Sequence, residues 1–178
     1  IGVSRVIDEN YHNQPEKFVE GLYKLGIASP LGLDIPGAAK KPNIRKPNKD
    51  NWSKTALAWM SIGYETQVPP MNTLAFYNAI ANNGKMVKPR FVKSIMKDGE
   101  VIENIPVEVL NPAIASPKTI EQIQMILEKV VSEGLGKRAG SSQFHVSGKT
   151  GTASPSMRNG WKRGIQKNRV PYVIVLSG

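Results

Sequence analysis

Ser147-Gly148-Lys149-Thr150-Gly151-Thr152-Ala153 is the stretch of this sequence that says most about its fold. It combines a lysine and two threonine hydroxyls with two glycines, which let the backbone come close to a ligand. Phe144, His145 and Val146 lead into it as a short segment with β propensity, so we expect the stretch to lie at the end of a strand. A cation, hydroxyls and free backbone N–H groups at such a place suit an anionic ligand that carries an acyl group. Carboxylate and phosphate are the two candidate anions.

A phosphate-binding P-loop is the first alternative, because Gly-Lys-Thr also ends that motif. The P-loop needs a glycine five positions before the glycine of Gly-Lys-Thr, and Gln143 stands there. The residues after the lysine should also open a helix, whereas Gly151, Ser154 and Pro155 oppose one. The sequence therefore disfavours a P-loop. A lysine on a solvated strand end remains as the purely structural alternative.

Lys149-Thr150-Gly151 also matches the third signature of the penicillin-recognising serine acyltransferases. Three other stretches stand before it in the order and spacing of one group of these enzymes: Gly32-Leu33-Asp34-Ile35-Pro36-Gly37, Ser61-Ile62-Gly63-Tyr64 and Ala81-Asn82-Asn83-Gly84. From Ile1 to about Ala153 the chain therefore resembles the transpeptidase domain of class B penicillin-binding proteins. These are monofunctional enzymes that cross-link peptidoglycan.

The resemblance implies a fold as well as an activity. The fold is α+β, the penicillin-recognising serine transpeptidase or β-lactamase-like architecture, in which helices pack against an antiparallel sheet. In that family the Ser-x-x-Lys and Ser-x-Asn motifs precede the matched region, and no Ser-x-Asn occurs in this sequence. We therefore expect residues 1–178 to be the C-terminal part of a single transpeptidase domain, incomplete, without the nucleophile and inactive alone.

One Ser-x-x-Lys does occur, at Ser94-Ile95-Met96-Lys97. It lies in a β-prone run that ends at Asp98-Gly99, a strong hairpin signal. Side chains three residues apart on a strand point to opposite faces, whereas a serine nucleophile and its lysine need a helical turn to lie together. We interpret this match as chance.

The activity implied by the resemblance is acyl transfer from D-alanyl-D-alanine stem peptides through a serine acyl-enzyme, which β-lactams block. Lys149 would supply positive potential and a proton path, and the Thr152 N–H would form half of the oxyanion hole. Thr150 and Thr152 would bind the substrate carboxylate with their hydroxyls, and Gly151 would let the acyl group approach the backbone. No cofactor and no metal is implied.

The implied partners are peptidoglycan stem peptides, β-lactam antibiotics and membrane-bound cell-wall synthesis or division machinery. The implied location is the bacterial envelope, on the outer (periplasmic) side of the cytoplasmic membrane, with an N-terminal anchor outside this sequence. No stretch approaches the ~20 apolar residues of a membrane span. The absence of cysteine excludes disulfides and thiolate metal sites, and two histidines are too few for a histidine-rich site.

A net charge of +10 leaves other functional classes open. Basic residues cluster in two places: Lys40, Lys41, Arg45, Lys46 and Lys49, then Arg158, Lys162, Arg163, Lys167 and Arg169. Solvated loops, attraction to an anionic membrane or wall polymer, and nucleic-acid binding would each explain them. Only Trp52 and Trp161 lie near these charges, whereas a single-strand binder interleaves aromatic residues to stack bases. A nucleic-acid-binding domain and a non-catalytic scaffold with the same fold remain as alternatives.

The remaining pattern predicts helices over residues 15–25 and 70–82 and from Pro117 to just before Gly134. It also predicts a short packed segment over 55–62, a loop from 38 to 50, a hairpin over 85–106 and strands from Phe144 and over 172–176. The expected core residues of the helices are Phe18, Leu22, Leu25, Met71, Leu74, Ala75, Ile80, Ile120, Ile123, Leu127 and Val130.

Overall fold

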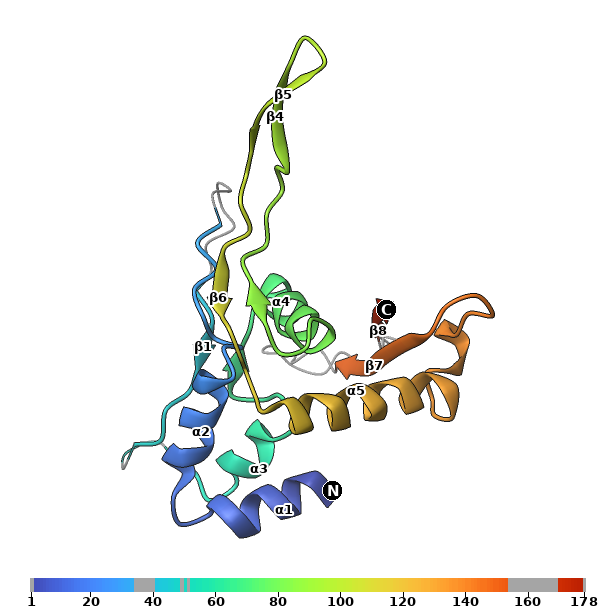
Figure 1. Ribbon diagram of the computed structural model, residues 1–178. Coiled ribbons are helices and arrows are strands. Elements are labelled where there is room, and N and C mark those ends of the chain that lie inside the picture. The colour runs from blue at the N-terminus through green and yellow to red at the C-terminus, as the bar shows by residue number, and fades with distance from the viewer. Residues whose placement is uncertain (1, 34–40, 49, 51, 154–169, 178) are drawn as a thin grey trace, which may run out of the picture. The chain divides into compact units, whose positions relative to one another are not determined.

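The computed structural model describes residues 2–33, 41–48, 50, 52–153 and 170–177, and from residue 152 onward it describes the backbone alone. The chain divides into two compact units, Ile1–Ser116 and Pro117–Gly178 (Figure 1). Both units contain helix and antiparallel strand pairs, which confirms the predicted α+β class. No helix among these residues is both long enough and apolar enough to cross a bilayer.

The described part of the first unit contains four helices and three pairs of antiparallel strands. The helices are α1 (Gly2–Tyr11), α2 (Pro15–Lys24), α3 (Ala56–Met60) and α4 (Pro70–Ala81). The strand pairs are β1 (Asn43–Ile44) with β2 (Thr66–Gln67), β3 (Met86–Val87) with β6 (Val109–Asn111), and β4 (Ser94–Lys97) with β5 (Glu100–Asn104).

Helix α2 forms as its sequence predicts, but its buried residue is Val19 and not the predicted Phe18, Leu22 or Leu25. Pro15 occupies the first turn, where the missing N–H costs nothing, and Gly26 follows the helix at φ 79°. Val19 on α2 lies in a buried cluster with Ala28, Ile44 and Met60. Phe18, Leu22, Ile27 and Trp52 pack against that cluster.

The sequence predicts a loop from residue 38 to 50, and this prediction is wrong where β1 forms. Asn43 and Ile44 pair antiparallel with Gln67 and Thr66, and the Ile44 side chain is fully buried. A strand of two residues is too short to show an alternating pattern in sequence. The tertiary contacts of Ile44 define it.

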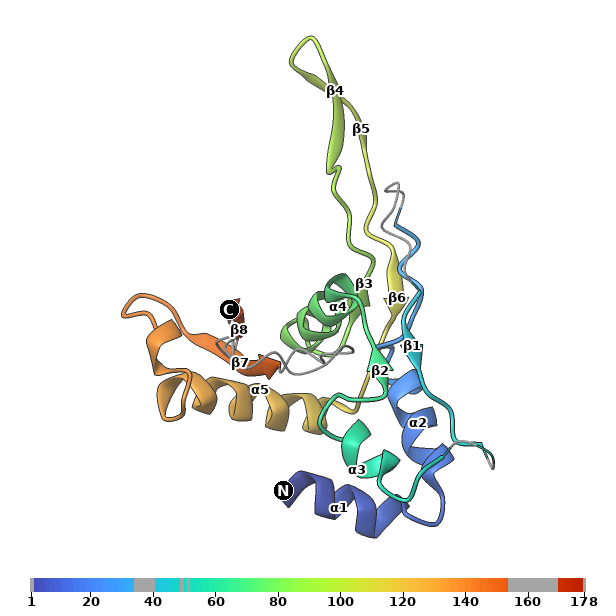
Figure 2. The ribbon, with the colours of Figure 1, turned by 180° about the vertical axis from the view of Figure 1, so that it is seen from behind.

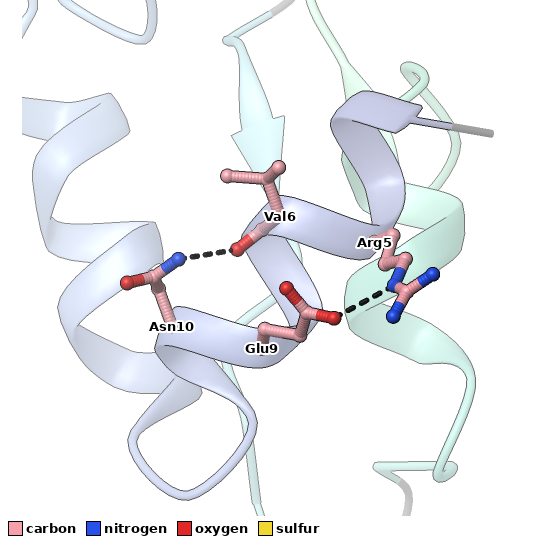
Figure 3. Close-up of polar contacts among 4 residues, drawn as sticks. All are labelled: Arg5, Val6, Glu9 and Asn10. Atoms are coloured by element: carbon pink, nitrogen blue, oxygen red, sulfur yellow. Dashed lines mark hydrogen bonds and ion pairs between the residues drawn. The ribbon is translucent and has the colours of Figure 1, made fainter.

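Helix α1 has no buried residue and makes several polar contacts, some of them within the helix. Figure 3 shows Arg5 Nε donating to Glu9 Oε1 at 2.7 Å, and Asn10 Nδ2 donating to the Val6 carbonyl at 2.7 Å. The hydroxyls of Ser61, next to α3, and Ser4 are hydrogen-bonded at 2.9 Å, which ties α1 to the segment predicted over 55–62.

Helix α4 is confirmed, with one error in its core. Ala75 and Ile80 are buried as expected, but Leu74 is 52% exposed. Asn72 is buried instead and donates from Nδ2 to the Ser29 carbonyl at 2.8 Å. This hydrogen bond satisfies a buried amide and fixes which side of α4 faces the core.

The β4–β5 hairpin is confirmed, including its turn at Asp98 (φ 50°) and Gly99 (φ 86°). Figures 1 and 2 show it extending away from the helices of its own unit. Ser94 and Lys97 are both in strand β4, so the helical turn that a nucleophile motif requires is absent from this Ser-x-x-Lys.

The second unit consists of α5 (Pro117–Ser132), the short 3-10 helix η1 (Lys137–Ala139), β7 (Val146–Ala153) and β8 (Val170–Ser177). Strand β7 lies along α5 (Figure 1). Of the predicted stripe, Ile120 and Leu127 are buried.

Two glycines turn the chain from α5 back toward β7. A Cβ at Gly134 would lie 2.8 Å from the Val130 carbonyl oxygen, and one at Gly136 would lie 2.9 Å from it. Both distances are shorter than a methyl group tolerates against backbone, so the turn that starts the path to β7 requires glycine.

Candidate active-site strand

The stretch from Ser147 to Ala153 forms most of strand β7. The prediction placed it at the end of a strand begun by Phe144, but the strand begins only at Val146. His145 lies outside the strand, where its Nδ1 is 3.3 Å from Glu128 Oε1 on α5. Lys149, Thr150, Gly151 and Thr152 are therefore consecutive residues of one strand, not of a loop that follows it.

The register with β8 determines which backbone groups of β7 are available to a ligand. Thr152 lies opposite Pro171, Thr150 opposite Val173 and Gly151 opposite Tyr172. Antiparallel strands alternate between residue pairs that exchange two hydrogen bonds and pairs that exchange none. Pro171 has no N–H to donate, so Thr152 and Pro171 suit a pair that exchanges no hydrogen bonds. In that register the N–H groups of Thr152 and Thr150 point away from β8.

The contact made by Lys149 agrees with this register. Its side chain is exposed, and its ammonium donates a hydrogen bond to the carbonyl oxygen of Thr150. A Thr150 carbonyl that points away from β8 is free to accept this bond. The positive charge of Lys149 and the N–H groups of Thr150 and Thr152 therefore gather along the same edge of β7.

Alternation along the strand separates the side chains into two sets. Thr150 and Thr152 share one face, and Lys149 and Gly151 share the other. Thr150 and Gly151 are half-buried, while the Thr152 side chain lies outside the described part of the structure. Two hydroxyl-bearing residues on one face, beside backbone donors and an ammonium, can bind a carboxylate and stabilise an oxyanion.

Two other sequence candidates cannot be placed relative to this strand. Asp34-Ile35-Pro36-Gly37 and the basic cluster from Arg158 to Arg169 lie outside the described residues. Within the described residues no group of three potential metal-binding side chains comes together. The feature that the sequence did not reveal is Pro171, because its effect depends on the register between β7 and β8.

Comparison with known proteins supplies an independent line of evidence. The family described as "Penicillin binding protein transpeptidase domain" matches residues 6–174. A "Probable peptidoglycan D,D-transpeptidase PbpC" from Pseudomonas aeruginosa is 32% identical over 162 residues, which are 90% of this chain and 26% of that protein. "Penicillin-binding protein PbpB" from Mycolicibacterium smegmatis is 31% identical over 147 residues, covering 78% of this chain and 22% of its own length. This chain thus spans about a quarter of these relatives.

Solved structures with a similar fold are also penicillin-binding proteins. Penicillin-binding protein 3 from Mycobacterium tuberculosis, solved in complex with aztreonam, aligns with a TM-score of 0.66 and 28% identity over 80% of this chain and 33% of that one. None of these three proteins is named for nucleic-acid binding, so that alternative gains no support from them. The predicted penicillin-recognising fold is confirmed.

Proposed function

Because the chain belongs to the transpeptidase-domain family of penicillin-binding proteins, we propose that it is part of a peptidoglycan cross-linking D,D-transpeptidase of class B. The reaction is acyl transfer from a D-alanyl-D-alanine stem peptide through a serine acyl-enzyme, and β-lactams are its inhibitors. Both compact units belong to one transpeptidase domain, and the serine nucleophile precedes Ile1. The observation that carries the proposal is the edge of β7, where the Lys149 ammonium lies at the carbonyl of Thr150.

Each residue of this edge has a role in that chemistry. The N–H of Thr152 donates to the carbonyl oxygen as it becomes an oxyanion, together with the N–H of the nucleophile itself. The hydroxyls of Thr150 and Thr152 hold the terminal carboxylate of the substrate. Lys149 stabilises the negative charge at that end of the cleft and gives protons a path to the Ser-x-Asn serine. Gly151 leaves room for the acyl group beside the backbone.

The partners and location follow from the same function. Penicillin-binding proteins are cell-envelope enzymes that act on peptidoglycan. We infer that this chain works on the outer side of the cytoplasmic membrane, held there by an N-terminal anchor, among membrane-bound proteins of wall synthesis or division. This proposal gives the basic clusters no role in nucleic-acid binding.

Replacing Thr152 by valine in the full-length protein tests the carboxylate clamp. Valine keeps the shape and the backbone N–H but removes the hydroxyl, so only the carboxylate loses a contact. A hydrogen bond to a charged group contributes about 1.5–3 kcal/mol, so the second-order rate of acylation by a fluorescent penicillin should fall roughly ten- to hundredfold.

Thr66→Val is the matched control, because the Thr66 hydroxyl donates to the Gly63 carbonyl in the first unit. We expect this variant to acylate at the wild-type rate. An unchanged rate in Thr152→Val, with the penicillin still carrying its carboxylate, would show that this hydroxyl does not bind substrate.

A further inference from the structure

A hollow of about 300 Å³ lies within the second unit, just before β7 begins. It is formed by the C-terminal half of α5 and the loop that leads into the strand. Its lining is Glu128, Val131, Ser132, Gly140, Ser141, Ser142, Gln143, Phe144, His145 and Val146. None of the roles assigned to Lys149, Thr150, Gly151 and Thr152 uses it. Its size is near the lower limit of ~300–1,000 Å³ for ligand pockets, which suits one small ring better than an extended chain.

The charges of the hollow disfavour an ionic ligand. Two backbone N–H groups of the lining, those of Gln143 and Phe144, already donate to the Ser141 hydroxyl oxygen at 3.1 and 3.3 Å and are not available to an anion. Glu128 would repel an anion. A cation would have to compete with His145, whose Nδ1 lies 3.3 Å from the Glu128 carboxylate. A neutral ligand meets neither obstacle.

The remaining groups suit a ligand that is rich in hydroxyls. Ser132, Ser142 and the amide of Gln143 can each donate and accept hydrogen bonds, and the side chain of Glu128 is 48% exposed and can accept from hydroxyls. Phe144 adds an aromatic ring that is 61% exposed. An apolar ring face beside donors and acceptors matches a pyranose, which has apolar C–H groups on its faces and hydroxyls around its edge.

We propose that this hollow binds an N-acetylhexosamine unit of the peptidoglycan glycan strand, an inference that rests on the proposed function. The hollow ends at Val146, which is four residues before Thr150 and six before Thr152. At about 3.3 Å per strand residue these separations are ~13 and ~20 Å. A stem peptide of four or five residues spans a similar length when extended. The residues that bind the carboxylate of the peptide would therefore lie on the same strand as the sugar site. The sugar site would lie at the start of that strand, and it would take the sugar to which such peptides are attached.

Binding of tri-N-acetylchitotriose, a peptide-free oligomer of N-acetylglucosamine, to the full-length protein tests this inference. Saturation-transfer NMR should detect the N-acetyl methyl and ring protons, and a titration should saturate. Phe144→Ala should weaken the affinity by about tenfold or more, a change well resolved by such a titration. Phe144→Tyr, which keeps a ring face, should restore binding.

Phe91→Ala is the matched control, because Phe91 is 62% exposed and lies in the first unit. It should bind the trisaccharide as wild type does. Absence of saturable binding to wild type, or equal affinity in Phe144→Ala, overturns the inference. So does a sugar-free stem pentapeptide whose binding depends on Phe144 when that of the trisaccharide does not.

Penicillin acylation of the same samples separates this inference from the proposed function. Penicillin carries no sugar, so Phe144→Ala should be acylated at the wild-type rate. Normal acylation without saccharide binding would overturn the sugar site alone. Saccharide binding without acylation of wild type would contradict the transpeptidase proposal instead.

Discussion

Full-length protein carrying Lys149→Ala should show no measurable acylation by a fluorescent penicillin, while its thermal unfolding stays at the wild-type temperature. The Lys149 side chain is exposed, and its hydrogen bond is to the carbonyl of the neighbouring Thr150. Its removal therefore costs little packing. In the proposed reaction, however, the ammonium would stabilise charge that develops at the edge of β7. Removing one such group costs roughly a hundred- to thousandfold in rate, and the loss of its proton path lowers the rate further.

Lys97→Ala provides the control for Lys149→Ala. Lys97 is also an exposed strand lysine, and it belongs to the Ser-x-x-Lys that we interpret as chance. This variant should be acylated at the wild-type rate. Acylation that survives in Lys149→Ala and fails in Lys97→Ala would reverse the roles assigned to the two strands.

Gly151→Val should lower the acylation rate by more than hundredfold, a larger loss than that expected for Thr152→Val. Valine suits a strand, so the pairing of residue 151 with Tyr172 should survive the change. The added methyl groups would instead fill the space through which the acyl group approaches the backbone. Stopped-flow or gel-based labelling at several penicillin concentrations measures this rate.

Gly151→Ala should lie between wild type and the valine variant, because it adds one methyl group to the same place. A graded loss from glycine to alanine to valine, at constant unfolding temperature, indicates steric exclusion of substrate. Equal rates in all three proteins would mean that β7 does not line the cleft.

Residues near the ends of the longer helices and at the turn of the hairpin were sufficient to predict these elements from the sequence. Pro15 and Gly26 bracket α2, Asp98-Gly99 turns the hairpin, and Pro117 begins α5. In each case the signal lies within a few residues of the boundary that it defines. This is why the sequence alone could predict these elements.

Features that depend on distant residues could not be predicted in the same way. Ile44 forms a strand because Thr66 lies opposite it. The sequence predicts Leu74 in the core because α4 is apolar on more than one side, whereas the buried hydrogen bond from Asn72 to the Ser29 carbonyl determines which side is buried.

In the candidate site, too, some features follow from neighbouring residues and others depend on distant ones. The β-prone residues Phe144, His145 and Val146 predict the strand, and the lysine, threonines and glycines that follow predict an anionic ligand for it. Which edge of that strand is open depends on its pairing with β8, where Pro171 lies opposite Thr152. No pattern within Ser147–Ala153 contains that information.

The most direct test of the central claim is to map the penicillin adduct on the full-length protein by peptide mass spectrometry. The claim is that β7 is one wall of an active site whose nucleophile lies elsewhere in the protein. We expect a single penicilloyl adduct on a serine of a Ser-x-x-Lys motif that precedes Ile1, absent from the Lys149→Ala protein. An adduct on Ser94 or on any other serine of these 178 residues, or no adduct at all, would contradict the claim.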